Sequence, residues 1–220
     1  MKQVVDAGYD REIFQTLKNR YKGLVISPAK LRASVDLSNS ESTYVFPMLE
    51  DGGQTVALKT EQRLNKNDVF FMTAIGFAIV EDLEAKPGIA VPQTYPNPFI
   101  FTQAADLEAV YNGILTYKVG TTEYITTLDL QRFRDVPETQ QTAATNRNQN
   151  NGLAGVIPLA SHYKIRGTDQ VEFSAKLPVY NGIVLESVAV GTKTRMILTP
   201  IGFLIKNGAS ADKDLESKSK

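Results

Sequence analysis

The sequence predicts an all-β protein, a sandwich or a barrel, and three observations lead to this fold class. Apolar and polar residues alternate over 30–38 and over 170–177, which is the period of a strand with one buried face. Turn-forming runs such as EDGG (50–53) separate such segments at short intervals. The pattern T-x-I-G-F-x-I occurs twice, as TAIGFAI (73–79) and TPIGFLI (199–205), each after a bulky apolar block. Short, closely spaced strands are typical of antiparallel sheets rather than of a parallel α/β sheet.

The N-terminal region predicts a helix over 10–22. Asp10 can cap this helix, and Gly23 follows it as a stop. Its apolar face comprises Ile13, Phe14, Leu17 and Tyr21. Residues 1–32 hold seven Lys/Arg against three Asp/Glu, so the helix is a candidate to face a neighbouring subunit or a membrane surface. We favour docking on its own domain or on a neighbouring copy, because four Lys/Arg do not make a dense basic face.

The rest of the chain predicts mainly strands. In chain order they cover 30–38, 43–49, 54–60, 69–80, 114–119, 122–130, 170–177 and 194–206, and the region near 183–190 is a candidate for a further strand. Inward positions are Leu31, Ala33, Val35 and Leu37 in the first strand, and Val171, Phe173, Ala175 and Leu177 in the strand over 170–177. A proline-rich connection leads to FTQAADLEAVYNG (101–113), which predicts a short helix with Thr102 as its cap. The polar stretch 138–152 predicts a surface loop, and the charged tail 210–220 predicts a frayed end or a contact segment.

Two glycines and a proline interrupt the copies of the repeated pattern. Pro200 donates no hydrogen bond to a ladder, and Gly76 and Gly202 weaken the strands that contain them. We expect a bulge or a close backbone crossing at both glycines, in equivalent places of two late, buried strands. These three residues are therefore expected to be structural bends rather than binding residues.

Length and charge limit the functions that the chain can serve. With 220 residues, of which 42% are hydrophobic, it can form one large β domain or two small ones. Lys+Arg and Asp+Glu both number 24, so the formal net charge is zero. A chain without net charge has no overall electrostatic attraction to nucleic acid, and little electrostatic repulsion keeps its copies apart. The composition is therefore compatible with dense self-assembly.

The chain contains no cysteine, which excludes disulfides, zinc–thiolate sites and cysteine nucleophiles. No apolar run approaches the ~20 residues of a membrane span, and the N-terminal residues MKQVVDAGYD lack the core of a signal peptide. We therefore expect a protein that is made and kept in a cytoplasm, or is carried outside by something other than its own signal.

The motifs of the chain give little support for an enzyme. The single histidine, His162, lacks the neighbouring partners that a general base or a metal ligand needs. The acidic clusters Glu50–Asp51 and Glu81–Asp82–Glu84 could offer oxygens to calcium, but their spacing matches no defined calcium loop. Phosphate-loop, dinucleotide and nucleophile-elbow patterns do not occur. We expect no catalysis and no cofactor beyond a weak candidacy of calcium, and keep a hydrolase with two close carboxylates as an alternative.

The aromatic residues favour neither nucleic acid nor sugar as a ligand. The nine tyrosines and ten phenylalanines fall mostly at inward strand positions, without the interleaved Lys/Arg of a base-stacking platform. Tryptophan, the usual stacking residue for sugars, is absent. A carbohydrate- or receptor-binding sandwich stays open as an alternative function.

Six segments together carry a resemblance to a known family. They are LVISPAKLRASVDLS (24–38), STYVFP (42–47), TEQRLNKNDVFFMTAIGF (60–77), TYPNPFIF (94–101), LEAVYNG (107–113) and RMILTPIGFLIKNG (195–208). They resemble the jelly-roll capsid proteins of icosahedral bacterial viruses, and most of all the small major capsid proteins of tailless phages with an inner membrane. The resemblance implies a virion protein with two stacked jelly rolls per subunit that forms trimers, and it brings no catalytic residues.

The number of predicted strands disagrees with two barrels. The chain offers about eight or nine clear strands; one jelly roll needs eight, and two would need about sixteen. We favour a single eight-stranded barrel with an N-terminal helix and keep a double jelly roll as the alternative. The expected divisions are an arm (1–23), a jelly-roll region (24–208) with halves or barrels at 24–98 and 99–208, and a charged tail (209–220).

The expected function is that of a structural virion protein, the major capsid protein, which self-assembles into an icosahedral shell. A capsid decoration protein and a carbohydrate- or receptor-binding module are the alternatives. The expected partners are further copies of the chain in a homotrimer, other virion proteins and, through the N-terminal helix, an inner membrane; specific nucleic acid is not among them. The expected location is the virion, after assembly in the host cytoplasm.

Overall fold

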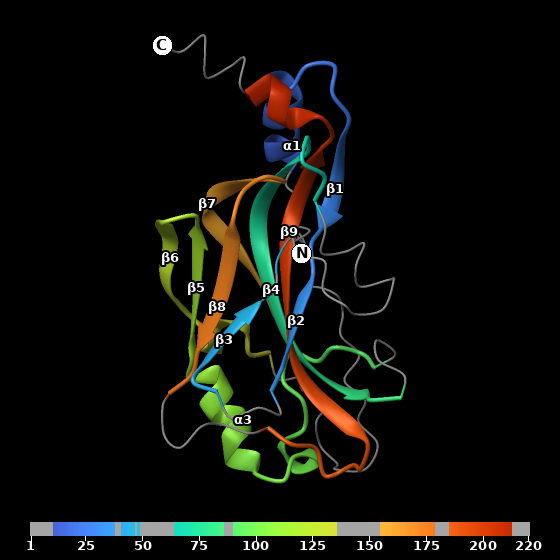
Figure 1. The fold of residues 1–220 in the computed structure, drawn as a ribbon, viewed down its shortest axis with the longest axis vertical. Coiled ribbons are helices and arrows are strands. Elements are labelled where there is room, and N and C mark those ends of the chain that lie inside the picture. Colours follow the sequence, from blue (N-terminus) through green and yellow to red (C-terminus); the bar gives the residue numbers. More distant parts are fainter. Residues whose placement is uncertain are drawn as a thin grey trace, which may run out of the picture.

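The computed structural model describes residues 11–37, 41–46, 48, 64–85, 90–135, 155–178 and 185–212. Strands make up 50% of these residues and form two antiparallel sheets (Figure 1). The all-β fold class predicted from the sequence is therefore confirmed, and the few helices are short.

The first sheet contains five strands. They are β1 (Ile26–Lys30), β2 (Ala33–Asp36), β4 (Val69–Leu83), β7 (Val156–Arg166) and β9 (Thr192–Ile205). The order is β1–β9–β4–β7, and β2 pairs with β9 next to β1. The long strands β4 and β9 lie side by side, with Val69 opposite Ile205 at one end and Leu83 opposite Thr192 at the other.

The second sheet contains four strands in the order β3–β8–β5–β6. They are β3 (Thr43–Phe46), β5 (Ile114–Val119), β6 (Thr122–Asp129) and β8 (Val171–Lys176). The helical elements are α1 (Arg11–Arg20), α3 (Ala104–Tyr111) and the 3-10 turns η1 (Pro98–Ile100) and η2 (Leu130–Phe133). Figure 1 shows α1 and α3 at opposite ends of the sandwich, so we name these the α1 end and the α3 end.

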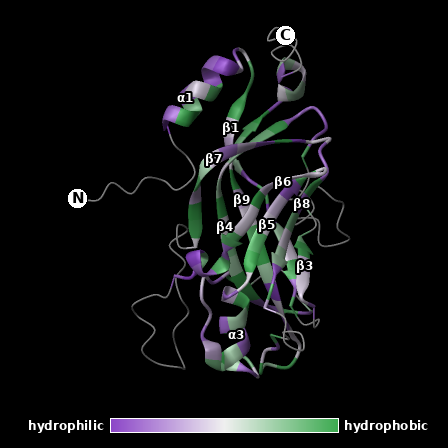
Figure 2. Ribbon diagram, turned by 90° about the vertical axis from the view of Figure 1, so that its left-hand side faces the viewer, coloured by the Kyte–Doolittle hydropathy of each residue, from purple (hydrophilic) through white to green (hydrophobic). Residues whose placement is uncertain are grey.

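The main core lies between the two sheets. Its large side chains include Phe70, Ile75, Phe77, Tyr117, Phe173 and Leu198, all buried. Figure 2 shows the hydrophobic residues concentrated along the paired strands in the middle of the molecule. A second, smaller cluster lies at the α1 end, where Leu17 and Tyr21 pack with Val69, Phe203 and Ile205. The first sheet is therefore apolar on both faces at this end.

Most predicted elements are present in the described residues. The helix over 10–22 is confirmed as α1, and Gly23, with a φ of +82°, follows its end. Strands predicted over 69–80, 114–119, 122–130, 170–177 and 194–206 are confirmed as β4, β5, β6, β8 and β9. The strand predicted over 43–49 is confirmed in part, as β3. The predicted strand at 54–60 and the predicted loop at 138–152 lie outside the described residues, as does Asp10.

Two of the wrong predictions concern the cap of α3 and the segment 183–190, and one strand was missed. The N-cap of α3 is Gln103 rather than Thr102, and its side chain makes no capping hydrogen bond. The described part of 183–190 is no strand: it runs beside η1 and makes a single bridge, from Ser187 to Phe101. β7 was not predicted as a strand, because its alternation is broken where its register with β4 jumps from Tyr163 to Pro158.

Pro200 explains why the strand predicted over 30–38 is divided into β1 and β2. Its carbonyl oxygen accepts a hydrogen bond from the Leu31 N–H at 2.9 Å. In an antiparallel ladder the N–H and C=O of one residue face the same neighbouring strand. The missing N–H of Pro200 therefore faces the break between β1 and β2, and β9 remains paired with β4 on its other side. The prediction of one undivided strand over 30–38 was therefore wrong.

The two glycines of the repeated pattern occupy different surroundings. Gly202 lies opposite Met72, where the register of β4 shifts between Met72 and Ala74. A Cβ on Gly202 would lie 1.9 Å from the Phe71 carbonyl oxygen, so the backbones cross too closely for any other residue. At Gly76 the ladder continues, and a Cβ would lie 3.4 Å from the Val156 Cγ2 atom. The prediction of an equivalent bend at Gly76 was therefore wrong.

Candidate functional site

The apolar face of α1 packs on the outer surface of the first sheet. Leu17 and Tyr21 are buried there, and Ile13 and Phe14 pack beside them, half-buried. The ring centroid of Phe14 lies 5.8 Å from that of Phe203 on β9. All four residues proposed for a subunit or membrane contact thus belong to one apolar cluster that α1 forms with the sheet of their own chain.

A buried carboxylate fastens α1 to the sheet. Asp212, in the short helical turn that follows β9, is 0% exposed. It accepts a hydrogen bond from the Tyr21 hydroxyl at 2.7 Å and pairs with Lys164 Nζ of β7 at 2.9 Å. Arg166 of β7 and Arg20 of α1 lie at 3.7 and 3.8 Å from its oxygens. Three chain segments, including the first and last described ones, therefore meet at one side chain.

The surroundings of Asp212 keep it ionised. Burial by itself would raise the pKa of this carboxyl, but the hydrogen bonds from Lys164 and Tyr21 and the charges of Lys164 and Arg166 hold the pKa below its ordinary value. Burial, followed by the hydrogen bond to the Asp212 carboxylate, raises the pKa of Tyr21. The cluster is a charged joint, with three cations around one carboxylate, rather than a group poised to exchange protons near neutral pH.

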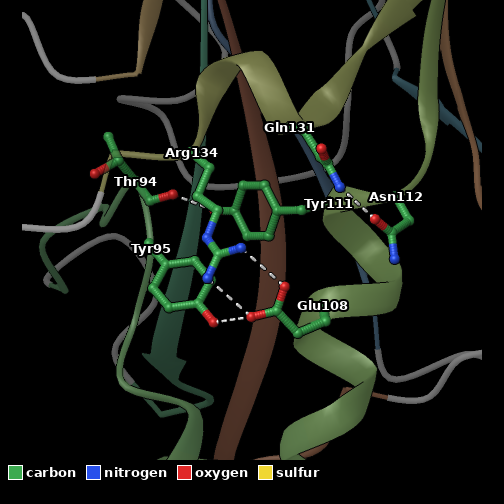
Figure 3. Close-up of polar contacts among 7 residues, drawn as sticks. All are labelled: Thr94, Tyr95, Glu108, Tyr111, Asn112, Gln131 and Arg134. Carbon is green, nitrogen blue, oxygen red and sulfur yellow. Dashed lines mark hydrogen bonds and ion pairs between the residues drawn. The ribbon is translucent and has the colours of Figure 1, made fainter.

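A second polar cluster lies at the α3 end (Figure 3). The guanidinium of Arg134 makes two hydrogen bonds of 3.0 Å to the Glu108 carboxylate on α3. The Tyr95 hydroxyl donates to the same carboxylate, and the Arg134 guanidinium carbon lies 4.3 Å from the Tyr95 ring centroid. Burial, and then the hydrogen bond to Glu108, raises the pKa of Tyr95 to about 12. Tyrosine, carboxylate and arginine thus form one stacked unit.

Further hydrogen bonds join this unit to its neighbours. The Tyr111 hydroxyl donates to the Thr94 carbonyl oxygen, and the Thr94 hydroxyl donates to the Asp135 carbonyl oxygen at 2.8 Å. Gln131 Nε2 donates to Asn112 Oδ1 at 2.6 Å. Together these bonds hold α3, η2 and the connection after β4 against one another, so the cluster closes the α3 end of the sandwich.

The sequence-predicted chemical residues do not converge. His162 is exposed, with its ring 5.6 Å from that of Phe71. Glu81 accepts from Ser187 and Thr192, whereas Asp82 accepts from the Ala90 N–H. Glu84 pairs with Lys193 at 3.2 Å, which gives each of the three carboxylates a different partner. Burial raises the pKa of Glu81.

Within the described ranges no three acidic or histidine side chains gather as a metal ion requires. Glu50 and Asp51 lie outside the described residues.

An open cleft of about 540 Å³ lies at the α1 end of the second sheet. Lys118 on β5 and the turn between β7 and β8 line it, with Asp169 and Glu172 as its acidic groups. Lys118 pairs with Glu172 at 2.8 Å, and Asp169 accepts the Arg166 N–H at 2.8 Å. The charged groups of the cleft are thus paired within the chain while their outer surfaces stay accessible.

Comparison with known proteins assigns no family. No family model matches the chain, and a search of curated proteins gives no match. Among the described residues, no helix is both long and apolar enough to cross a membrane. Function must therefore be argued from the fold and its surfaces.

Sequence reasoning missed both polar clusters. Asp212 was placed in a tail expected to be frayed or to make contacts, because the run around it is charged and no pattern marks one charge as buried. Glu108 and Arg134 are separated by 26 positions, and only the path of the chain brings them together. A usable signal was LEAVYNG (107–113), where Leu107, Val110 and Tyr111 mark a buried helix face next to Glu108.

Proposed function

We propose that this protein is a structural component of a virion, the major capsid protein, built as a single jelly roll that self-assembles into a closed shell. The observation that carries the proposal is the order of the strands. A jelly-roll subunit offers a rigid body with loops at both ends, and shells are formed by many modest, symmetric contacts between such bodies.

The strand order corresponds to one long hairpin that has been rolled up. β5 pairs with β6 across a short turn, and the next pair outward is β4 with β7. β3 pairs with β8, and β2, the continuation of β1, pairs with β9. When β1 and β2 are counted as one strand, these nested pairs are distributed over two layers of four strands, which supports an eight-stranded jelly roll. All described strands belong to this one sandwich, which supports one barrel over two.

The packed interior of the sandwich supports a structural role for the protein rather than the binding of a ligand between the sheets. Tyr117 stacks on Phe173 at 4.5 Å between ring centroids, and Phe77 packs edge-on against Tyr111 at 5.9 Å. Jelly rolls that act as enzymes or lectins need an accessible site, and fold alone does not decide among these uses. Here large side chains fill the space between the layers, and both polar clusters join segments of the chain.

The test is the assembly state of the purified full-length protein. Sedimentation velocity over a wide concentration range should show trimers or larger closed species, and negative-stain electron microscopy should show shells or shell fragments with regular spacing. A stable monomer at the highest concentration reached would contradict the proposal. Assembly only in the presence of another virion protein's shell would favour the decoration protein instead.

A receptor- or carbohydrate-binding module is the second candidate, and the open cleft favours it. Its Lys118 and Asp169 could bind hydroxyl groups. A glycan array probed with the wild-type protein tests this function. Binding that is lost in Lys118→Ala but kept in Lys193→Ala, a control at the α3 end, would support it.

A further inference from the structure

The α3 end carries an exposed apolar surface. Four large side chains form it, and we call them the apolar tip: Leu83 (50% exposed), Phe99 (79%), Val188 (65%) and Val190 (100%). Single exposed apolar residues are ordinary, but several on segments bound to one another mark an interaction surface.

Backbone hydrogen bonds hold the segments of the apolar tip together. The Val188 N–H donates to the Ile100 carbonyl oxygen at 2.8 Å, which fixes residues 185–191 beside η1. The Glu84 N–H donates to the Gly191 carbonyl oxygen at 2.9 Å, which fixes the same residues to the end of β4. The apolar tip is therefore a defined surface of the fold.

The border of the apolar tip is acidic. Glu84 and Glu186 are exposed beside it, and Glu81, just before the buried Asp82 in β4, is half-buried. Lys193 is already engaged by Glu84 at 3.2 Å and Asp36 at 3.7 Å. Two copies meeting tip to tip would bring like charges together, which is unfavourable at an interface.

The α1 end offers the opposite charge around a smaller apolar centre. Val25 is 63% exposed there. The Lys206 N–H donates to the Val25 carbonyl oxygen at 3.0 Å, and Lys22 lies three residues before Val25 in the chain. Both lysine side chains are exposed. Lys18 and Arg20 on α1 are exposed as well. Among the described residues this end therefore complements the apolar tip in charge and in apolar character.

We propose that the apolar tip of one copy docks on the α1 end of a second copy, with Val190 and its neighbours against Val25 and with Glu186 facing Lys206. The contact joins two different surfaces, so repetition gives a ring or a closed shell when the rotation between copies permits closure. It specifies the partner surface for the self-assembly proposed above, and it rests on that proposal.

A charge exchange in the full-length protein tests the contact. Glu186→Lys and Lys206→Glu should each raise the concentration at which half of the protein assembles by ~10-fold or more, because each places like charges across the interface. The double variant should return close to the wild-type concentration, because the pair is then restored in reverse. Val190→Asp should act like the single variants, whereas Glu123→Lys on β6 is the matched control and should change little. Sedimentation velocity gives the assembly state, and circular dichroism with thermal unfolding verifies that each variant is folded.

The outcomes separate this contact from the proposed function. If the wild type assembles and the tip variants assemble equally well, the contact is wrong while self-assembly stands. If the single variants lose assembly and the double variant does not recover it, the pairing of the apolar tip with the α1 end is wrong. A wild type that stays monomeric contradicts the proposed function and the contact together.

Discussion

The two copies of T-x-I-G-F-x-I lie in neighbouring strands, yet they face opposite sides of the same sheet. In β4, Phe77 points into the main core, where it packs on Tyr111 and Phe133. In β9, Phe203 points to the outer surface, where it packs on Phe14 of α1. The same local sequence therefore forms a β-strand in both places, but its phenylalanine packs in a different hydrophobic cluster in each.

The bulge opposite Gly202 accounts for this difference. Before the register shift, the even-numbered residues Phe70 and Met72 of β4 face the main core; after it, the odd-numbered Ile75, Phe77 and Ile79 do so. A one-residue shift exchanges the two faces of a strand, because successive side chains point to opposite sides. In β9 the even-numbered Met196, Leu198 and Leu204 face the main core on both sides of Gly202. The bulge thus turns Phe77 of β4 to the main core, whereas Phe203 of β9 stays on the outer face.

Replacing the two glycines should give the largest contrast. Gly202→Ala places a Cβ 1.9 Å from the Phe71 carbonyl oxygen, and we expect a loss of roughly 5 kcal/mol in the free energy of unfolding, or no folded protein. Gly76→Ala meets the Val156 side chain at 3.4 Å and Thr199 at 3.6 Å, both ordinary contacts, and should change stability by about 1 kcal/mol or less. Urea unfolding of both variants measures the difference. Equal midpoints for the two would show that the close crossing does not control the fold.

Truncating the two phenylalanines should give the next largest effects. Phe77→Ala opens a cavity in the main core and should cost about 4 kcal/mol, while Phe203→Ala, under α1, should cost about 3 kcal/mol. The location of the damage distinguishes them further. Hydrogen exchange should accelerate selectively in the α1 amides of Phe203→Ala, whereas Phe77→Ala should weaken both sheets. A uniform response in both variants would contradict two separate clusters.

Removing the buried charge at Asp212 tests what holds α1 over Phe203. Asp212→Asn should lower the free energy of unfolding at neutral pH by roughly 2–3 kcal/mol, below the full range for a broken buried pair because Lys164 and Arg166 stay partly exposed. The folded-state pKa of Asp212 is lowered, so its stabilisation is complete above the ordinary carboxyl value of 3.8 and is lost as pH falls through the lowered pKa. The difference between wild type and variant should therefore shrink below about pH 4. A difference that stays constant down to pH 2 would argue against an ionised Asp212.

The sequence supported the strands and their inward residues, because period-two alternation is a local property. It could not assign the faces of the repeated pattern, since the face of Phe77 depends on a bulge that lies opposite Gly202 of another strand. It also led to the expectation of equivalent bends at Gly76 and Gly202, because equal sequences were taken to have equal neighbours. A Cβ at Gly202 would overlap the Phe71 backbone at 1.9 Å, while a Cβ at Gly76 would meet its nearest neighbour, the Val156 side chain, at 3.4 Å.

The polar clusters escaped prediction for a related reason. Asp212 stands in a run of charged and small residues where most side chains would be solvated, and its burial depends on α1 and β7 meeting over it. Such long-range pairs have no local signature in one sequence. The apolar helix face around Leu17 was predictable. Packing of this face on the sheet of its own chain, however, was only one of the alternatives.

Weakening the cluster over the Phe77 core should give the smallest effect of the series. Glu108, like Asp212, accepts from a tyrosine and pairs with a cation, but its side chain is 44% exposed. Solvent screens such a pair, so Glu108→Gln should cost about 1 kcal/mol or less, even though its hydrogen bonds to Arg134 are bidentate. Thermal unfolding of Glu108→Gln beside Asp212→Asn measures the two joints under one condition. A loss in Glu108→Gln equal to that in Asp212→Asn would mean that geometry, rather than burial, sets the strength of these carboxylate joints, because burial is the larger difference between them.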